Sequence, residues 1–387
     1  MTTTAIDVGV GVGADEEEEA EETRKVAAFL ARCGLSAEEA VPRMHDFARG
    51  MFPGCEVVVA PFQGYCSYTL LLVPLGEAER RDSGCEVGKD ERLVQFRPRK
   101  HGIDVGMCGE ARKILGAAVG VPFVEELGVV EGELVGYVVE RVGGVSLTEL
   151  RRRHNDGLQV ERRKRIVRDL AGMFADSWRG RRDAAAVVKG KIGGSLRWRL
   201  DVMAQRLPRE FRGVVGRVMR QMDEIDGLEW VVTHGDLVSD NIMVKEDGGV
   251  VGLIDWAEAE WLPFGVGMYG LEEVLGEDVA VDHETGRSRF EYYPEARELR
   301  DLFWEEVGRV VDDEDVLKRA RWAQVLGVLL WRGIAFDDGN LGRVVDERDW
   351  WDLQRLRTWL FDEKGLGMKE RWWERVWRGA RELMSCL

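Results

Sequence analysis

The first part of the chain passes from helical spacing of apolar residues to short apolar runs. An apolar helix is predicted around Val26–Leu30. A second helix is predicted after Ser36, which forms a capping-box pattern with Glu39 three residues later. Runs rich in β-branched and apolar residues then predict three strands, at residues 57–59, 68–73 and 92–97.

A helix and a hairpin complete this β-rich part. The helix is predicted around residues 109–118, and the apolar runs at 129–130 and 134–142 flank the turn Glu131-Gly132-Glu133. We therefore expect a small β lobe that carries one helix.

From Ser146 onward the pattern is mainly helical. Ser146 and Glu149 form a second capping-box pattern, and apolar residues recur at helical spacing between 160 and 178. One short β patch, at 241–244 and 250–254, interrupts the helices. The fold class predicted from this order is α+β, with a small antiparallel β lobe and a larger, mainly helical lobe.

The chain start differs from both parts. Residues 1–22 combine small residues with the acidic run Asp15–Glu19, a composition that favours a disordered tail. We therefore divide the chain into an acidic tail, an N-terminal helical extension, a small lobe and a helical lobe, at residues 1–22, 23–55, 56–142 and 143–387.

Composition narrows the class of protein. The 387 residues are 45% hydrophobic and 33% charged, as in soluble globular proteins, and the net charge of -16 argues against non-specific binding to nucleic acid. The six cysteines form no Cys-x-x-Cys pair, and no apolar run approaches the roughly 20 residues that cross a bilayer. We expect a cytoplasmic protein with no zinc site, no nucleic acid and no membrane as partner.

One polar cluster carries a recognisable chemistry. Asp236 and Asn241 stand five residues apart in His234-Gly235-Asp236-Leu237-Val238-Ser239-Asp240-Asn241. This is the spacing of a kinase catalytic loop, in which the aspartate accepts the proton of an attacking hydroxyl and the asparagine holds magnesium. We expect Asp236 to be the base and Asn241 a metal ligand, with His234 orienting the loop.

A second carboxylate follows on the next predicted strand. This strand ends in Leu253-Ile254-Asp255-Trp256, which puts Asp255 beside the expected catalytic loop. Because Mg²⁺ prefers oxygen ligands and takes one or two carboxylates, Asp255 is the expected main magnesium ligand.

On these residues the chain resembles the aminoglycoside phosphotransferase and choline kinase superfamily, which has a protein kinase-like fold, and within it an uncharacterised fungal branch. The family pattern is His-Gly-Asp, four residues, Asn, a hairpin and Ile-Asp-Trp, and residues 234–256 fit it. Glycine rather than arginine at 235 favours this family over the protein kinases. The resemblance covers about 57–261 and implies an ATP-dependent transfer of phosphate to a small-molecule hydroxyl, with ATP and Mg²⁺ as cofactors.

The resemblance also implies nucleotide contacts in the small lobe. The hinge would correspond to residues 139–142, with Glu140, and the helix glutamate of the family to Glu110. Gln95 stands where the family often has a lysine, and it cannot supply the positive charge. Arg97 lies two residues on, hence on the same face of the strand, and could substitute.

The turn between the first two strands is a further candidate. Residues from Gly64 to Ser67 could cover the phosphates with backbone N–H groups, although an ordinary hairpin turn explains the glycine as well.

Two other functions remain open. Gln95 is compatible with a catalytically weak or inactive nucleotide-binding pseudokinase that has a regulatory role. A metal-dependent phosphoesterase is the other, although the five histidines form no second cluster. The acceptor is not identified. Carboxylates and aromatic residues that could hold an amine, or could belong to the core, follow the loop: Glu258, Glu260, Trp261, Tyr269, Glu272 and Glu273.

Overall fold

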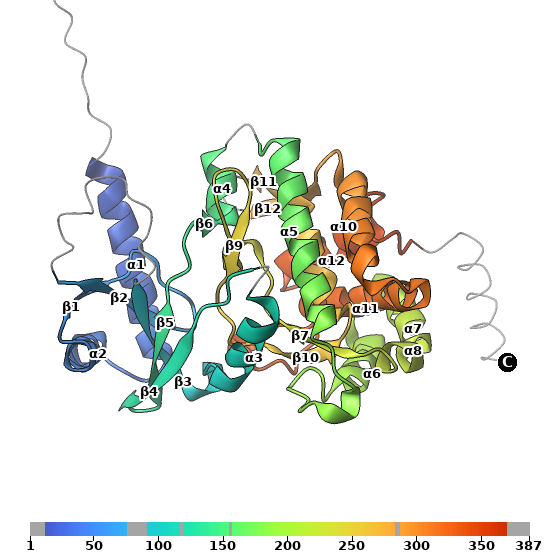
Figure 1. Ribbon diagram of the computed structural model, residues 1–387. Coiled ribbons are helices and arrows are strands. Elements are labelled where there is room, and N and C mark those ends of the chain that lie inside the picture. The colour runs from blue at the N-terminus through green and yellow to red at the C-terminus, as the bar shows by residue number, and fades with distance from the viewer. Residues whose placement is uncertain (1–11, 76–90, 117–118, 155–156, 283–286, 370–387) are drawn as a thin grey trace, which may run out of the picture. The chain divides into compact units, whose positions relative to one another are not determined.

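The computed structural model describes residues 12–75, 91–116, 119–154, 157–282 and 287–369, and the chain divides into two compact units (Figure 1). The β unit comprises residues 1–109 and 122–143, and the helical unit comprises 110–121 and 144–387. The units differ from the predicted lobes at residues 110–121. The reason is strand-like pairing, because the Gly120 N–H donates to Val251 O (3.0 Å) and Gly120 O accepts from Leu253 N (2.9 Å).

The β unit contains one antiparallel sheet of five strands in the order β1-β2-β3-β5-β4. In this sheet Tyr68 pairs with Phe96, and Gln95 pairs with Tyr137. The predicted strands and hairpin are confirmed. Their bounds are β1 Cys55–Val59, β2 Tyr68–Pro74, β3 Arg92–Pro98, β4 Val124–Glu131 and β5 Leu134–Glu140. The polar segment 77–90, which is expected to form a loop between the second and third strands, lies outside the described residues.

Two helices, α1 (Val12–Arg32) and α2 (Ala37–Met51), belong to the same core as the sheet. Phe29 and Leu30 of α1 and Met44 of α2 are buried with the side chains of Tyr68, Leu70 and Phe96. Burying these apolar groups stabilises the unit. The N-terminal extension is therefore part of the β unit.

The predicted acidic tail needs correction. Residues 1–11 lie outside the described residues, but α1 begins at Val12, so the second half of the tail is helical rather than disordered. Glutamate is a good helix former, and Lys25 pairs with Glu21 (3.4 Å) and Glu22 (2.6 Å) one turn before it. Acidic composition alone therefore does not distinguish a helix from a disordered tail in this segment.

The two capping-box patterns have different outcomes. Ser36 precedes α2, but its side chain makes no capping bond; the helix is held instead by its buried face, Ala40, Met44 and Ala48. Ser146 does cap α4 (Leu147–Arg153), since its Oγ accepts a bond from the Glu149 N–H at 3.1 Å. The first prediction is wrong in its hydrogen bond, and the second is confirmed for the bond to the Ser146 side chain.

The helix α3 (Val105–Leu115) begins four residues before its predicted start. Asp104 is the cause, because its carboxylate accepts a bond from the Met107 N–H at 2.9 Å and so caps the first turn. A short 3₁₀ turn, η2 (Arg99–His101), precedes it.

The helical unit is built around α5 (Val160–Arg179), which packs against α10 (Ala296–Val311), and around α11 (Glu314–Gly333), which packs against α12 (Trp350–Phe361) (Figure 1). The predicted apolar face of α5 is buried except at its first residue, Val160. The shorter elements are η3 Ala184–Ala186, α6 Leu196–Arg206, α7 Arg209–Arg220, α8 Met222–Asp226, η4 Ser239–Asn241, η5 Val266–Tyr269, α9 Gly270–Val274 and η6 Asp337–Gly339. An α+β fold with a small antiparallel unit and a larger helical one is confirmed.

Three small antiparallel sheets lie in the helical unit. Two of them position residues of the candidate site, because β7 leads into His234 and β9 leads into Asp255. The sheets are β6 (Val145–Ser146), β8 (Ile242–Val244) and β9 (Val250–Leu253); β7 (Trp230–Thr233) with β10 (Glu260–Pro263); and β11 (Gly276–Asp282) with β12 (Arg287–Tyr292).

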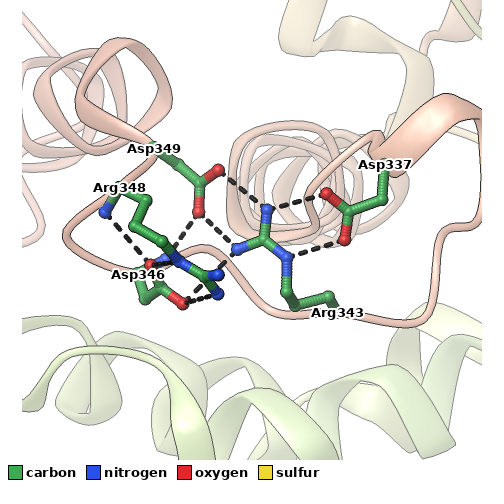
Figure 2. A network of polar contacts seen from close by, with 5 residues as sticks. All are labelled: Asp337, Arg343, Asp346, Arg348 and Asp349. Carbon is green, nitrogen blue, oxygen red and sulfur yellow. Dashed lines mark hydrogen bonds and ion pairs between the residues drawn. The ribbon is translucent and has the colours of Figure 1, made fainter.

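The connection from α11 to α12 is closed by a polar network (Figure 2). Arg343 donates to Asp337 (2.6 Å) and to Asp349 (2.6 Å), and Arg348 donates to Asp346 (2.6 Å). The two ends of this loop are thereby tied together before α12 begins.

Among the helices that the structure describes, none combines the length and the apolar character required to cross a membrane.

Candidate active site

The candidate catalytic loop begins with a turn that only glycine fits. Gly235 follows β7 with φ +83°, and a Cβ at this position would lie 1.9 Å from the carbonyl oxygen of Glu258. Neither this left-handed backbone nor this close approach suits a residue with a side chain. The glycine that the sequence pattern required is therefore a steric necessity.

His234 joins the start of the loop to the end of β9. Its Nε2 lies 2.9 Å from Ile254 O, and its Nδ1 lies 3.2 Å from the Asp236 N–H. These partners fix the neutral tautomer, with Nε2 as donor and Nδ1 as acceptor. Burial lowers the pKa of His234 to about 4, which also favours the neutral ring. The imidazole packs edge-to-face on Trp256, with centroids 4.6 Å apart.

Asp236 and Asn241 are in direct contact. The Nδ2 of Asn241 donates to Asp236 O at 2.8 Å and to Asp236 Oδ2 at 3.0 Å. Burial, and next the charge of Asp255, raise the pKa of Asp236 to about 7, while the bond from Asn241 opposes this rise. The structure thus brings together the two residues that the spacing singled out.

Asp255 stands just beyond β9. Its φ of +59° is left-handed, a conformation that aspartate tolerates better than most residues, and its side chain is exposed. Asp255 and Asn241 are linked through the neighbouring backbone, since the Ile254 N–H donates to Asn241 O at 3.0 Å.

These side chains fit a hard cation. Asn241 uses Nδ2 in its bonds to Asp236, so its oxygen takes no part in them, and Asp255 offers carboxylate oxygens. Oxygen donors of this type suit Mg²⁺. Within the described residues, no group of three or more His, Cys, Asp or Glu is arranged to hold a metal ion.

Gln95 and Arg97, two of the candidate nucleotide residues, lie side by side in the β unit. Arg97 Nη1 is 3.5 Å from Gln95 Oε1, as expected for residues two apart on β3, and Arg97 is 3% exposed. Glu140 ends β5, and its carboxylate accepts a bond from the Phe123 N–H at 3.0 Å. This hinge glutamate therefore has a bond to the neighbouring backbone.

The turn between β1 and β2 is held by side chains. The amide of Gln63 donates to Ala60 O (3.1 Å) and Thr69 O (2.9 Å) and accepts from the Thr69 N–H (2.9 Å). Gly64 is exposed, whereas Ser67 is buried, with its Oγ 3.4 Å from Thr69 Oγ1. The turn therefore has its own internal support.

Glu110 belongs to the helical unit. Its carboxylate pairs with Lys113 (2.9 Å) and Arg182 (2.6 Å), which together lower its pKa. The predicted role of Glu110 beside the strand residues stays a prediction.

Residues 112–266 match the model of the phosphotransferase enzyme family. Over this segment, the chain is similar to that family. This phosphotransferase segment contains the whole candidate catalytic loop and Asp255, and it leaves Gly64, Ser67, Gln95, Arg97 and Glu110 outside. The predicted superfamily is confirmed, while its fungal branch stays a prediction.

Solved structures of low sequence identity are similar over most of their length. A candidate aminoglycoside phosphotransferase from Ralstonia eutropha JMP134 is 16% identical, with 85% of this chain and 97% of that chain covered and a TM-score of 0.45. Macrolide 2'-phosphotransferase type I is 13% identical (81% and 95% covered, TM-score 0.45). Choline kinase LicA from Streptococcus pneumoniae is 11% identical (81% and 99% covered, TM-score 0.43). No curated protein matches the chain.

The carboxylates that follow the loop have partners inside the protein. Glu260 accepts bonds from the N–H groups of Ile192 (3.0 Å) and Gly193 (2.8 Å), and Glu272 pairs with Arg300 at 2.7 Å. Glu273 pairs with Arg332, which also pairs with Asp352 at 3.0 Å. Because these carboxylates are buried and already have partners within the helical unit, they are poor candidates for binding an amine.

The aromatic residues of the same region are also buried. Trp261 lies under the Arg182 guanidinium, with the carbon of that group 4.6 Å from the ring centroid, and Tyr269 stacks on Trp331 at 4.9 Å. Of the six candidate acceptor residues, only Glu258 is partly exposed.

Two contacts to the loop were not predicted. The Leu237 N–H donates to the Tyr269 hydroxyl at 2.8 Å, and Arg151 Nη1 donates to Ser239 Oγ at 2.7 Å. Arg151 is one of three consecutive arginines in α4, and nothing in the sequence distinguishes it from Arg152 and Arg153.

Proposed function

We propose that this protein transfers the γ-phosphate of ATP to a hydroxyl group of a small molecule. The observation that carries the proposal is the contact between Asp236 and Asn241, next to Asp255, within the phosphotransferase segment. A base beside a phosphate-binding metal site is the arrangement that phosphoryl transfer requires.

The reaction divides its tasks among these residues. The acceptor oxygen attacks the γ-phosphorus, the bond from that phosphorus to the β–γ bridging oxygen breaks, and ADP leaves. The proton of the acceptor hydroxyl passes to the carboxylate of Asp236. Asn241 keeps this carboxylate oriented through its Nδ2 bond at 3.0 Å, and neutral His234 holds the loop against the end of β9.

Magnesium, when bound, would neutralise the charge of the phosphates, and the oxygens of Asn241 and Asp255 would hold it. Asp255 reaches the same region from another strand, and its charge raises the pKa of Asp236. The metal site therefore draws on two separate segments of the chain.

Among the proposed nucleotide contacts, Gln95 is neutral where the family often has a lysine. Arg97, beside Gln95 on the same face of β3, would supply the positive charge that a strand lysine supplies elsewhere. The residues proposed to contact the nucleotide are Gly64, Ser67, Gln95, Arg97, Glu110 and Glu140.

A second function, a nucleotide-binding pseudokinase with a regulatory role, is favoured by one observation. Gln95 is neutral and accepts a bond from Arg97 through its side-chain oxygen, so this position itself offers no cation to the phosphates. Such a protein would bind ATP without turning it over.

Calorimetric titration with ATP, with and without Mg²⁺, together with ADP release in the presence of hydroxylated metabolites, separates these functions. Asp236→Asn is expected to keep Mg-ATP binding and to lose transfer by about 10²–10⁴-fold, the usual contribution of a general base. Asp255→Asn is expected to weaken Mg-ATP binding itself.

Asp240 provides the matched control, because it lies in the same loop but is exposed. Asp240→Asn should behave like the wild type. Magnesium-dependent binding without turnover of any acceptor would favour the regulator, and no binding of ATP under either condition would refute both functions.

A further inference from the structure

We infer that Arg151 and Tyr269 are positioning residues. Arg151 contacts the candidate catalytic loop at Ser239, and Tyr269 contacts it at Leu237. Together these two contacts form a clamp that fixes the positions of Asp236 and Asn241. The inference rests on the proposed function for its effect on catalysis. The clamp itself is a property of the loop, and it can be measured without any substrate.

Arg151 connects the loop to three other places in the helical unit. Its guanidinium donates to Ser239 Oγ (2.7 Å), to the Tyr293 hydroxyl (3.1 Å) and to the backbone oxygens of Glu273 (2.9 Å) and Gly276 (2.7 Å). Four bonds with different partners fix the planar group in one orientation. Through Arg151, Ser239 is therefore connected to α4, α9, the start of β11 and Tyr293, which follows β12.

Tyr269 holds the other side of the loop. Its hydroxyl accepts the Leu237 N–H at 2.8 Å, and Leu237 is the residue directly after Asp236. The ring is 4% exposed and stacks on Trp331 with an interplanar angle of 14°, so the hydroxyl has little freedom to move. Leu237 itself is buried.

The two contacts lie in the part of the loop whose position determines where the proposed base and metal ligand stand. Leu237 and Ser239 lie between Asp236 and Asn241, and the Asp236 carboxylate has its own bond only to Asn241 among the contacts described above. A displacement of about 1 Å at a reacting group can cost about 100-fold in rate. Loss of either contact should therefore lower kcat without removing a group that binds the nucleotide.

Arg151 differs in this respect from its neighbours. Arg152 and Arg153 are exposed and pair with Glu149 on the same helix, at 2.7 and 2.8 Å. Arg152→Gln therefore removes the same charge from the same helix without touching the loop, and it serves as the matched control for Arg151→Gln.

The least disruptive variants remove one loop contact each. Ser239→Ala leaves Arg151 with its three other partners, and Tyr269→Phe keeps the stacked ring. In both variants kcat should fall about 10–100-fold while the KM for ATP stays within about twofold of the wild type, and the melting temperature should fall by only a few degrees, the cost of one donor left without its partner. Arg152→Gln should keep the wild-type kcat, and unchanged kcat in both loop variants would overturn the inference.

A double-mutant cycle tests whether Arg151 acts through Ser239. Once Ser239→Ala has removed the shared bond, adding Arg151→Gln should lower kcat by less than it does in the wild type. Fully additive losses would mean that Arg151 acts elsewhere, and would refute its role as part of the clamp.

Amide hydrogen exchange of the segment 236–241 tests, independently of activity, whether the two contacts hold the loop in place. Exchange at this segment should accelerate in Ser239→Ala and in Tyr269→Phe, and not in Arg152→Gln. If the wild type transfers no phosphate, the proposed function fails while this measurement still stands. Unchanged exchange in both loop variants would overturn the clamp itself.

Discussion

At the scale of single residues, the candidate site depends on two left-handed positions. Gly235 and Asp255 have φ values of +83° and +59° and stand at the two turns that bring the loop and the proposed metal ligand together. Aspartate can adopt this conformation at a modest cost, whereas Gly235 has the additional constraint of the Glu258 carbonyl.

We expect Gly235→Ala to lose nearly all activity and to lower the melting temperature. The added methyl group meets Glu258 O at 1.9 Å, so the backbone of the loop must move and Asp236 moves with it. Kinetics and thermal unfolding measure the two effects. Gly172 in α5 is the control, because a Cβ there meets no atom within 4 Å.

Gly172→Ala should leave activity unchanged and raise helix stability by up to about 1 kcal/mol. If Gly235→Ala were as active as Gly172→Ala, the conclusion that only glycine fits at position 235 would be wrong.

The sequence predicted the local part of the site and not its supports. His234, Asp236 and Asn241 are brought together by one loop of eight residues, so their spacing alone indicates their contact. Tyr269 is 32 residues from Leu237, and Arg151 is 88 residues from Ser239. Such pairs depend on how helices pack, and a single sequence does not show which arginine of three turns inward.

At the scale of elements, the two serine caps give a direct comparison. Ser146→Ala should destabilise the protein by about 1 kcal/mol, because it leaves the Glu149 N–H without its capping bond. Ser36→Ala should cost distinctly less, because Ser36 makes no such bond. Chemical denaturation of both variants measures the difference, and equal losses would contradict this account of the caps.

The difference between the caps could not be predicted from the pattern Ser-x-x-Glu, which is the same in both. In α4 the Glu149 carboxylate turns to Arg152 and Arg153, so only half of the capping box forms. The acidic N-terminal segment shows the same limit, since its composition indicated disorder whereas α1 begins at Val12. Both outcomes depend on neighbouring charges and packing that composition does not record.

At the scale of the whole molecule, buried ion pairs join the C-terminal helices to α9, the helix after Tyr269. Glu273 is 3% exposed and pairs with Arg332 of α11, while Glu272 is fully buried and pairs with Arg300 of α10. A charge left alone in such a place costs several kcal/mol.

Arg332→Met is therefore expected to lower the free energy of unfolding by about 3–5 kcal/mol, since Glu273 stays buried without its partner. Adding Glu273→Gln removes the unpaired charge and should restore part of the loss. Urea unfolding of the single and double variants tests this, and an equal or greater loss in the double variant would contradict the proposed cause.

Residues 110–121 belong to the helical unit, although the residues before and after them in the chain belong to the β unit. This segment is therefore synthesised long before its partners. The β unit is complete once Gly143 has left the ribosome, but residues 110–121, made earlier, have their partners in Val251 and Leu253. For more than a hundred residues of translation, this segment is present without the strand with which Gly120 pairs. A nascent chain stalled in that interval would expose the segment to chaperones, and a fragment starting at Gly144 would lack it altogether.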